Sequence, residues 1–386
     1  MNVKKQLLII LLICVAIISA YSEDKSFITD DWKEELNELE EKDMFYGNIG
    51  PVIRYDNQLL VQYESYYYQE RRYKTYYLSV EYGIFWDIFV IDPKYEIKSI
   101  KKDNDKYYAV LWNDIDSYLA EKSIGQDKWE RILTFANDNS KGFTLYAEKG
   151  KVCVVSESKI YLNLDNTEFK AFDIPTFSGS DRIQEPSIGI SKNNTIYFGN
   201  NFGEWGGNLY KVVYDSEKEI LEYTKLMDQN IDKVVITRAD DIYCLLSSAH
   251  GLSATTALYK IDGKEVNTLF YKTTYAPIRP NMTFPDDSVD VYGWKDIIGS
   301  NMIRDVVTFE DKLLFLISNI GVYYIDSDNK LEKIKDLPFF EEKYTINNGD
   351  SPYNTMNSVK QLSIEDNTIS VIYRLPLIFS TEVSFE

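Results

Sequence analysis

A glycine-rich stretch near the middle of the chain, Asn200–Asn208, carries residues suited to ligand binding. Its candidate side chains are Asn201, Phe202, Glu204 and Trp205. Glycine permits positive φ angles and a close approach of the backbone to a partner. A tryptophan offers a flat apolar face and an N–H donor. The stretch could therefore stack on a sugar ring or grip a peptide; alternatively, its glycines form a wide turn and Trp205 packs over the protein itself.

Two further segments combine charged and aromatic residues. Tyr67, Arg71 and Arg72 form a cationic and aromatic spot that could bind an acidic or planar ligand, since arginine forks match carboxylates. The alternative is a solvated hairpin. Asp290 and Trp294 follow two more aspartates, and clustered carboxylates could hold Ca²⁺ or act as an acid/base pair. Their spacing matches no known calcium loop, and the alternative is a solvated acidic loop.

The motifs of common catalytic and cofactor sites are missing from the sequence. His250 is the only histidine, and no cysteine or aspartate stands at zinc-ligand spacing from it, so it remains a ligand-binding candidate only. There is no Ser/His/Asp arrangement, no P-loop and no dinucleotide fingerprint. We therefore predict no catalytic residue, no metal and no cofactor.

The elements that position these residues come from an internal repeat of apolar strand, tight polar turn and apolar strand. We anchor each copy on the first apolar residue after the turn. The anchors are Leu59, Tyr107, Val152, Ile196, Ile242, Leu313 and Ile369. The first five are spaced roughly 45 residues apart.

Columns around the anchor agree between copies. Two residues before it, every copy has Asn, Asp or Gly, which tolerate positive φ in a hairpin turn. Seven residues before it, every copy is apolar except at Gly189. A second motif of apolar, aromatic, any and apolar residues follows, as in Ile88–Asp92, Leu258–Asp262 and Val322–Asp326. Each unit therefore predicts four short antiparallel strands, a to d.

Four-stranded units at this period resemble the β-propeller superfamily, in which WD40-type and kelch blades run ~40–50 residues. Apolar runs such as Leu313–Leu316 fit strands that neighbouring blades bury on both faces. The Trp-Asp blade ending is missing, and the kelch double glycine occurs once, at Gly206–Gly207. The resemblance is to secreted bacterial propellers of unassigned function, and it implies an architecture but no reaction.

The predicted fold is all-β, a seven-bladed propeller of four-stranded blades over residues 44–386. The gap between the fifth and sixth anchors exceeds the period by about 26 residues, which we assign to an insertion at about 273–302; an eighth, degenerate blade is the alternative. A short helix is predicted within residues 23–43. We expect Met44–Tyr46 to supply an outer strand that closes the ring, because open sheet edges favour aggregation.

The first 22 residues have the pattern of a signal peptide: Lys4 and Lys5, an apolar run over Leu7–Ile18, and a cleavage site near Ser22. The protein is therefore expected to be exported, whether periplasmic, cell-surface or secreted, with an uncleaved anchor as the alternative. The remaining cysteines, Cys153 and Cys244, lie in apolar strand-like runs and are predicted to be free and buried.

Composition limits the partners. Asp and Glu number 61 against 42 Lys and Arg, a formal charge of −19. Nucleic acid and anionic membranes require a basic surface and are not expected as partners. We predict a monomer without membrane insertion after cleavage.

The strand order of a blade suggests where a ligand would bind. The a–b and c–d turns share one end of an antiparallel blade, and the b–c and d–a loops share the other. Most of the candidate residues fall in the second set. We therefore predict a non-enzymatic module that binds a protein or carbohydrate through that face. The alternative is a secreted polysaccharide-degrading glycoside hydrolase or lyase, with Glu204 and Asp290 as acid and base; a surface-layer role is third.

Overall fold

The computed structural model describes most of the chain from residue 48 onward. The described ranges are 48–336 and 359–382, without 56–57, 68–71, 82–84, 137, 139, 141, 165–167, 176–182, 184, 204–205, 251–252, 276–286, 310–311, 327, 366–367 and 374–377. The predicted signal peptide, the predicted helix and Met44–Tyr46 lie outside the described residues, so these three remain predictions.

The described residues form seven antiparallel sheets, of which the first four have four strands each. The first contains β1 (Asn48–Tyr55), β2 (Gln58–Tyr67), β3 (Arg72–Glu81) and β4 (Phe85–Ile88). The second contains β5 (Glu96–Asp103), β6 (Lys106–Trp112), β7 (Ser117–Ser123) and β8 (Glu130–Thr134). The third contains β9 (Phe143–Glu148), β10 (Lys151–Ser156), β11 (Lys159–Asn163) and β12 (Lys170–Asp173). The fourth contains β13 (Ser187–Ile190), β14 (Ile196–Asn201), β15 (Gly207–Asp215) and β16 (Ile220–Met227).

The other three sheets vary in strand number. The fifth contains β17 (Lys233–Ile236), β18 (Ile242–His250), β19 (Ser253–Asp262), β20 (Glu265–Tyr275) and the short β21 (Val289–Asp290). A four-residue helix, α3 (Lys295–Ile298), leads to the sixth sheet. That sheet contains β22 (Ile303–Phe309), β23 (Lys312–Ile317), β24 (Gly321–Ile325) and β25 (Leu331–Lys335). The last contains β26 (Val359–Glu365), β27 (Thr368–Tyr373) and β28 (Ile378–Glu382).

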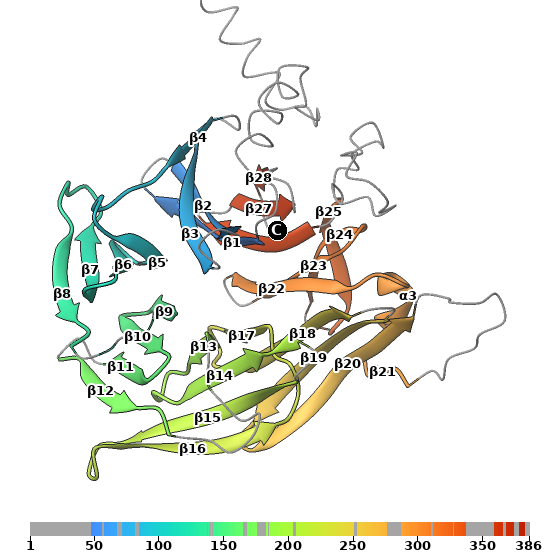
Figure 1. Ribbon diagram of the computed structural model, residues 1–386. Coiled ribbons are helices and arrows are strands. Elements are labelled where there is room, and N and C mark those ends of the chain that lie inside the picture. The colour runs from blue at the N-terminus through green and yellow to red at the C-terminus, as the bar shows by residue number, and fades with distance from the viewer. Residues whose placement is uncertain are drawn as a thin grey trace, which may run out of the picture.

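The sheets follow one another around a circle, with the first strand of each nearest the centre (Figure 1). Each first strand contacts the first strand of the next sheet, and β26 contacts β1, which closes the circle. Within each sheet the strands pair in chain order. This is a β-propeller, as the repeat predicts. The blade count of the complete chain stays a prediction, because residues 337–358 are outside the described part.

The repeat anchors confirm the strand assignment. Each of the seven lies in the second strand of its sheet, from Leu59 in β2 to Ile369 in β27. The turn column takes the expected conformation, with φ of 76° at Gly150, 63° at Asn194 and 76° at Asp240. In the second sheet the turn column is occupied by Asp105, and the positive φ angle, 51°, is found at the preceding residue, Asn104. Small and amide-bearing residues there satisfy the geometry of a tight hairpin.

One part of the strand prediction is wrong. The motif at Ile88–Asp92 was expected in a third strand, but the third strand of the first sheet is β3 and the motif begins at the last residue of β4. The reason is the length of the β2–β3 hairpin, whose two strands have 10 residues each and displace the pattern. The motif's apolar residues pack instead between the first two sheets, where the rings of Phe89 and Tyr55 lie 4.7 Å apart.

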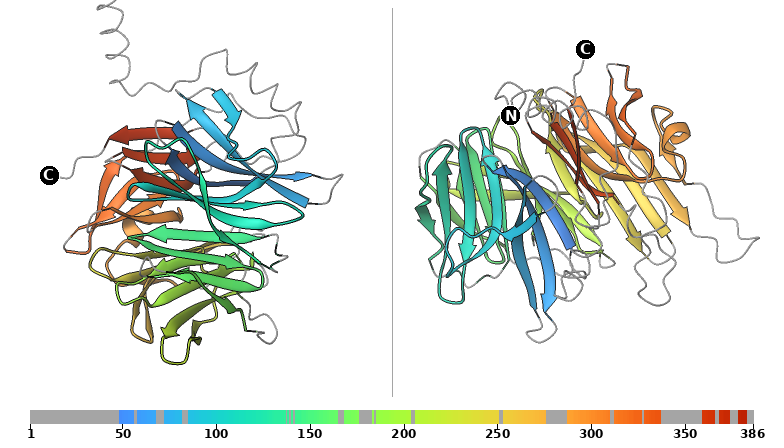
Figure 2. Two further views of the ribbon diagram at one scale, coloured as in Figure 1. Left: turned by 90° about the vertical axis from the view of Figure 1, so that its left-hand side faces the viewer. Right: turned by 90° about the horizontal axis from the view of Figure 1, so that it is seen from above.

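The hydrophobic core is divided into layers between neighbouring sheets. Six clusters of buried side chains are described, and each joins two adjacent sheets. Figure 2 shows these sheets lying face against face. Gly189 departs from its apolar column because a Cβ there would lie 2.8 Å from Val234 Cγ1 of the next sheet. Cys153 and Cys244 are free and buried as predicted, and burial raises the pKa of both thiols.

Candidate functional site

The two ends of the ring differ in construction. We call the end with the a–b and c–d connections the turn end and the end with the b–c and d–a connections the loop end. At the turn end, Asp103 accepts hydrogen bonds from the backbone N–H groups of Lys149 (2.8 Å) and Gly150 (2.6 Å) in the next sheet. Asp240 accepts one from the backbone of Lys192 in the same way (2.8 Å). These carboxylates tie the hairpin turns of neighbouring sheets together.

Two long hairpins carry predicted site residues at the loop end. Tyr67 is the last residue of β2 and pairs with Arg72, the first residue of β3. His250 is the last residue of β18 and pairs with Ser253 in β19. These three therefore lie at hairpin ends on the predicted face, and Arg71 is outside the described residues. Whether they bind a ligand stays a prediction.

The Asn200–Asn208 stretch is a tight, internally bonded connection between β14 and β15. Asn200 is 0% exposed, and its Nδ2 donates to Asn208 Oδ1 at 2.7 Å. The backbone N–H of Phe202 donates to the carbonyl of Gly206 (2.8 Å), and both Gly203 (φ 62°) and Gly206 (φ 86°) adopt the left-handed conformation. Glu204 and Trp205, at the tip of this loop, are outside the described residues.

The segment before β17 braces this loop from the side. Asn230 Nδ2 donates to the Gly203 carbonyl (2.8 Å), and Asn201 Nδ2 donates to Asp232 Oδ1 (2.5 Å). The other oxygen of Asp232 accepts the backbone N–H of Ser247 at 2.5 Å. The described residues of this loop are therefore hydrogen-bonded to the segment beside it. That brace was not predicted, because Asn230 and Asp232 belong to no repeat column.

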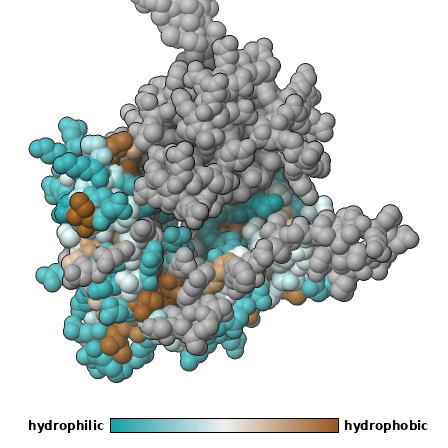
Figure 3. All heavy atoms as spheres, viewed as in Figure 1, coloured by the Kyte–Doolittle hydropathy of each residue, from teal (hydrophilic) through white to brown (hydrophobic). Residues whose placement is uncertain are grey.

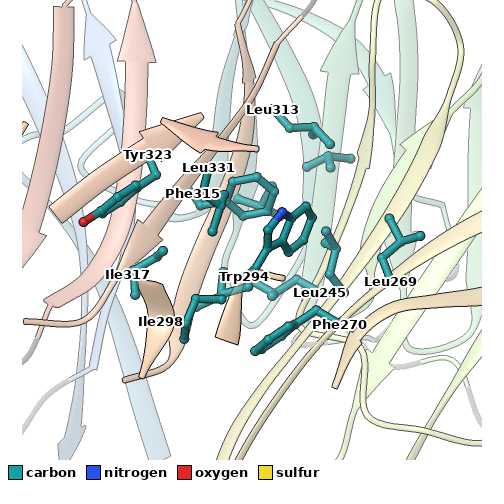
Figure 4. Close-up of a cluster of buried hydrophobic side chains, with 14 residues drawn as sticks. Leu245, Leu269, Phe270, Trp294, Ile298, Leu313, Phe315, Ile317, Tyr323 and Leu331 are labelled. Carbon is teal, nitrogen blue, oxygen red and sulfur yellow. The ribbon is translucent and has the colours of Figure 1, made fainter. Parts of the chain in front are cut away.

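Asp290 and Trp294 have structural partners. The two carboxylate oxygens of Asp290 accept the backbone N–H groups of Trp294 and Lys295, both at 2.8 Å, at the start of α3. Trp294 is 1% exposed and packs against Phe270 and Phe315, between the fifth and sixth sheets (Figure 4). Its indole N–H donates to the carbonyl of Asn329 at 2.8 Å. These contacts make Trp294 part of the core and Asp290 a cap of the helix.

Charged side chains from several sheets meet near the centre of the ring. This central charged cluster consists of Lys101, Glu148, Asp232, Lys233, Arg304 and Asp305. Burial, and then the charge of Lys233, lowers the pKa of Lys101 to about 8, while Asp305 and Glu148 act in the opposite direction. These four residues belong to β5, β9, β17 and β22, so only the circular arrangement brings them together. In the space-filling view of Figure 3, the face shown is hollowed near its middle, and the visible wall of the hollow is hydrophilic.

Asp305 organises one side of this cluster. It is 4% exposed, and its Oδ1 accepts hydrogen bonds from Lys233 Nζ (2.7 Å) and from the backbone N–H of Val306 (2.8 Å). Its Oδ2 accepts the backbone N–H of Leu362 in β26 at 2.8 Å. One carboxylate therefore joins the fifth, sixth and seventh sheets. Close by, the pKa of Asp232 is raised, mainly because surrounding protein displaces water from its carboxylate, although the residue as a whole is exposed.

Two other carboxyl groups approach each other at the loop end. A Cβ built on Gly142 would lie 2.5 Å from Glu185 Oε1 and 3.6 Å from Glu157 Oε1, so both oxygens border the same point. Burial and then the charge of Glu157 raise the pKa of Glu185, and Lys98 lowers it. Glu185 also has a positive φ of 44°. The sequence did not point to this pair, since both residues lie in connections between repeats.

A repeat column does point to the cations. Nine residues before the anchor stand Lys98, Lys233, Arg304 and Lys360 in four of the seven copies. In three of these copies the innermost strand has a β-bulge there, because the pairing register shifts across Lys98, Arg304 and Lys360. A bulge re-aims the side chain that it carries and often lies beside functional sites. This column is the signal that could have found Lys233 and Arg304.

Among the described residues, no group of three or more His, Cys, Asp and Glu side chains is arranged to hold a metal ion. The same part of the chain contains no helix long and apolar enough to cross a membrane.

No protein-family model and no characterised protein sequence matches the chain. Among solved structures it is similar to YCF48 from Cyanidioschyzon merolae, with a TM-score of 0.47 and 12% identity over 87% of this chain and 95% of that one. It is also similar to the β-propeller domain of the Trilobed protease from Pyrococcus furiosus, with a TM-score of 0.46 and 10% identity over 86% and 92% of the two chains. Acylaminoacyl peptidase of Pyrococcus horikoshii gives a TM-score of 0.46 and 9% identity over 89% of this chain and 53% of that one. The assignment as a β-propeller rests on the chain's own sheet order.

Proposed function

We propose that this protein is an extracytoplasmic, seven-bladed β-propeller that binds a protein or glycan ligand through its loop end without catalysing a reaction. One observation carries the proposal. At the loop end, acidic groups such as Asp232 and Glu185 reach solvent although surrounding protein raises their pKa values. Groups with shifted pKa values that still reach solvent are typical of functional sites. At the opposite end, Asp103 and Asp240 accept backbone N–H groups of neighbouring hairpin turns.

The braced loop between β14 and β15 supports this reading. A loop that is already held in one conformation loses little conformational entropy when a partner binds, which favours affinity. The hydrogen bonds from Asn201 and Asn230 supply that order in the described part of the loop. Export rests on the leader-like pattern of residues 1–22, and the seven blades rest on the seven repeat copies.

The test compares the two ends of the ring. A Glu204→Ala/Trp205→Ala variant changes the loop tip and leaves the bonded residues Asn200, Asn201 and Asn208 in place. A matched control, Lys106→Ala, removes an exposed ion pair with Glu121 at the turn end, worth ~0–1 kcal/mol. We expect a glycan array, paired with a pulldown from an envelope fraction of its own cells, to identify a ligand that wild type and the control bind and the loop variant loses. A ligand that all three bind equally would remove the loop tip from the site.

A second function, polysaccharide cleavage, is favoured by the Glu157–Glu185 pair rather than by Glu204 and Asp290. Asp290 is committed to capping α3, whereas Glu185 has the raised pKa expected of a general acid. Glu157 already accepts the backbone N–H of Gly142 at 3.1 Å. Release of reducing ends from a polysaccharide panel, abolished by Glu185→Gln, would favour the enzyme. Glycan binding without cleavage would favour the binding module.

A further inference from the structure

Arg304 has a buried nitrogen without a partner. Its Nε is shielded from solvent and makes no hydrogen bond, and the side chain forms no ion pair with any described residue. Burial lowers the pKa of Arg304, while the charge of Asp232 raises it. Buried donors in native proteins are nearly always satisfied, so one that is not calls for an acceptor.

The backbone places Arg304 where a ligand could reach it. The residue is second in β22, the innermost strand of its sheet, directly after the connection that contains α3. It is also the extra residue of the bulge between Ile303 and Asp305. The first residues of an innermost strand lie at the loop end, which is the end assigned to ligand binding above.

The neighbouring acids are already engaged. Both oxygens of Asp232 accept hydrogen bonds, from Asn201 and from the backbone of Ser247. Asp305 holds Lys233 and two backbone N–H groups. Neither acid is within ion-pair distance of Arg304, so the guanidinium is near negative charge but is not neutralised by direct contact.

A second cation of the central charged cluster also lacks a direct ion pair within the described part of the chain. Lys101 has no ion pair with a described residue, and the charge of Lys233 makes its protonated form less stable. Lys233 is paired with Asp305, and its charge acts on Lys101, so additional negative charge at the centre would favour the protonated form of Lys101.

We propose that Arg304, with Lys233 of the neighbouring sheet, binds a single carboxylate group of the ligand at the loop end of the ring. The inference rests on the proposed function, since it specifies the chemistry recognised at the same face. A guanidinium presents paired donors that match the two oxygens of a carboxylate. One carboxylate suits the site better than a polyanion, because Asp232 and Asp305 stand close by and the whole chain has a formal charge of −19.

The experiment uses the full chain and pairs of probes that differ only in the carboxylate. Galacturonate oligosaccharide is compared with a neutral galactose oligosaccharide, and a short peptide with a free C-terminus with its amidated form. Calorimetric titration of wild type should show binding of at least one carboxylate probe and at least tenfold weaker binding of its neutral partner. The oligosaccharide pair tests for recognition of a uronate, and the peptide pair tests for recognition of a C-terminal carboxylate.

Arg304→Gln should then lose tenfold or more in affinity for that carboxylate probe, and Arg304→Lys should recover part of it. Arg131→Gln is the matched control, since Arg131 lies on the outer strand β8 and pairs with Asp116.

If Arg304→Gln does not fold, the thermal unfolding midpoint of the wild-type protein provides the test. That midpoint should rise with the carboxylate probe and stay unchanged with the neutral probe. Equal binding of both members of each pair would overturn the inference. Loss of ligand in the Glu204→Ala/Trp205→Ala variant but not in Arg304→Gln would overturn the inference while leaving the proposed function intact.

Discussion

The turn end and the loop end of this propeller use charged side chains differently. At the turn end, Asp103 and Asp240 accept backbone N–H groups from a neighbouring sheet, so their carboxylates join hairpin turns. At the loop end and in the centre, Asp232, Glu185, Lys101 and Arg304 have shifted pKa values, and Lys101 and Arg304 form no ion pair with a described residue. The same four-stranded unit therefore has a structural end and an end with charge available for a ligand.

Asp305 lies in the centre of the ring, but both of its carboxylate oxygens accept hydrogen bonds, as those of Asp103 do at the turn end. Asp305→Ala should lower the free energy of unfolding by about 3 to 4 kcal/mol, because it leaves Lys233 and two buried backbone N–H groups unpaired. Urea titration measures the loss. An Asp305→Ala/Lys233→Met double variant should recover part of it, since no unpaired ion remains; a double variant less stable than the sum of the singles would contradict this account.

The structural role of the turn end predicts a smaller effect for Asp103→Ala. Two hydrogen bonds to the turn at Lys149 and Gly150 are lost, at a cost of about 2 kcal/mol. Ligand binding at the loop end should not change. Thermal unfolding and ligand titration of the same variant separate the two properties, and a loss of binding at full stability would break the distinction between the ends.

Substitution of Lys101 tests whether a positive charge in the centre of the ring lowers the free energy of unfolding. Its pKa in the folded protein, about 8, lies below the ordinary value of 10.5, so the folded state disfavours the protonated form. Stability should therefore rise as pH increases between about 8 and 10.5. Lys101→Met should raise the free energy of unfolding at pH 7 by about 1 to 2 kcal/mol and remove that rise. A variant with unchanged stability and an unchanged pH profile would show that the charge is well solvated.

Substitution of Glu185 should have the smallest effect on stability, and the pH dependence of that effect should be opposite to that of Lys101. Its folded-state pKa is raised, so the folded protein binds a proton that the unfolded chain has released, and stability falls as pH rises through that window. Glu185→Gln should be slightly more stable than wild type at pH 7, with the difference vanishing in acid. Chemical denaturation at both pH values checks this. Glu157→Gln is the companion variant: it should lower the pKa of Glu185, which NMR titration follows.

The sequence predicts the strands well because their signals are local. An anchor such as Val152, its turn residue Gly150 and the apolar residues around them lie within one hairpin, and hydrophobic pattern and turn chemistry act over that range. The free buried cysteines follow from the same patterns. Trp294 shows the limit: an aromatic residue in an acidic segment suggested a binding surface, but packing between two sheets buried it.

The sequence by itself determined that this chain is built from repeated four-stranded units, and it placed most of the candidate loops at one end of them. Only the tertiary structure decided which charges meet. Lys101, Lys233 and Asp305 come from three different sheets, and closing the ring brings their innermost strands around one centre. No local pattern encodes such a meeting, because it depends on the packing of whole sheets against one another rather than on the residues near each charge.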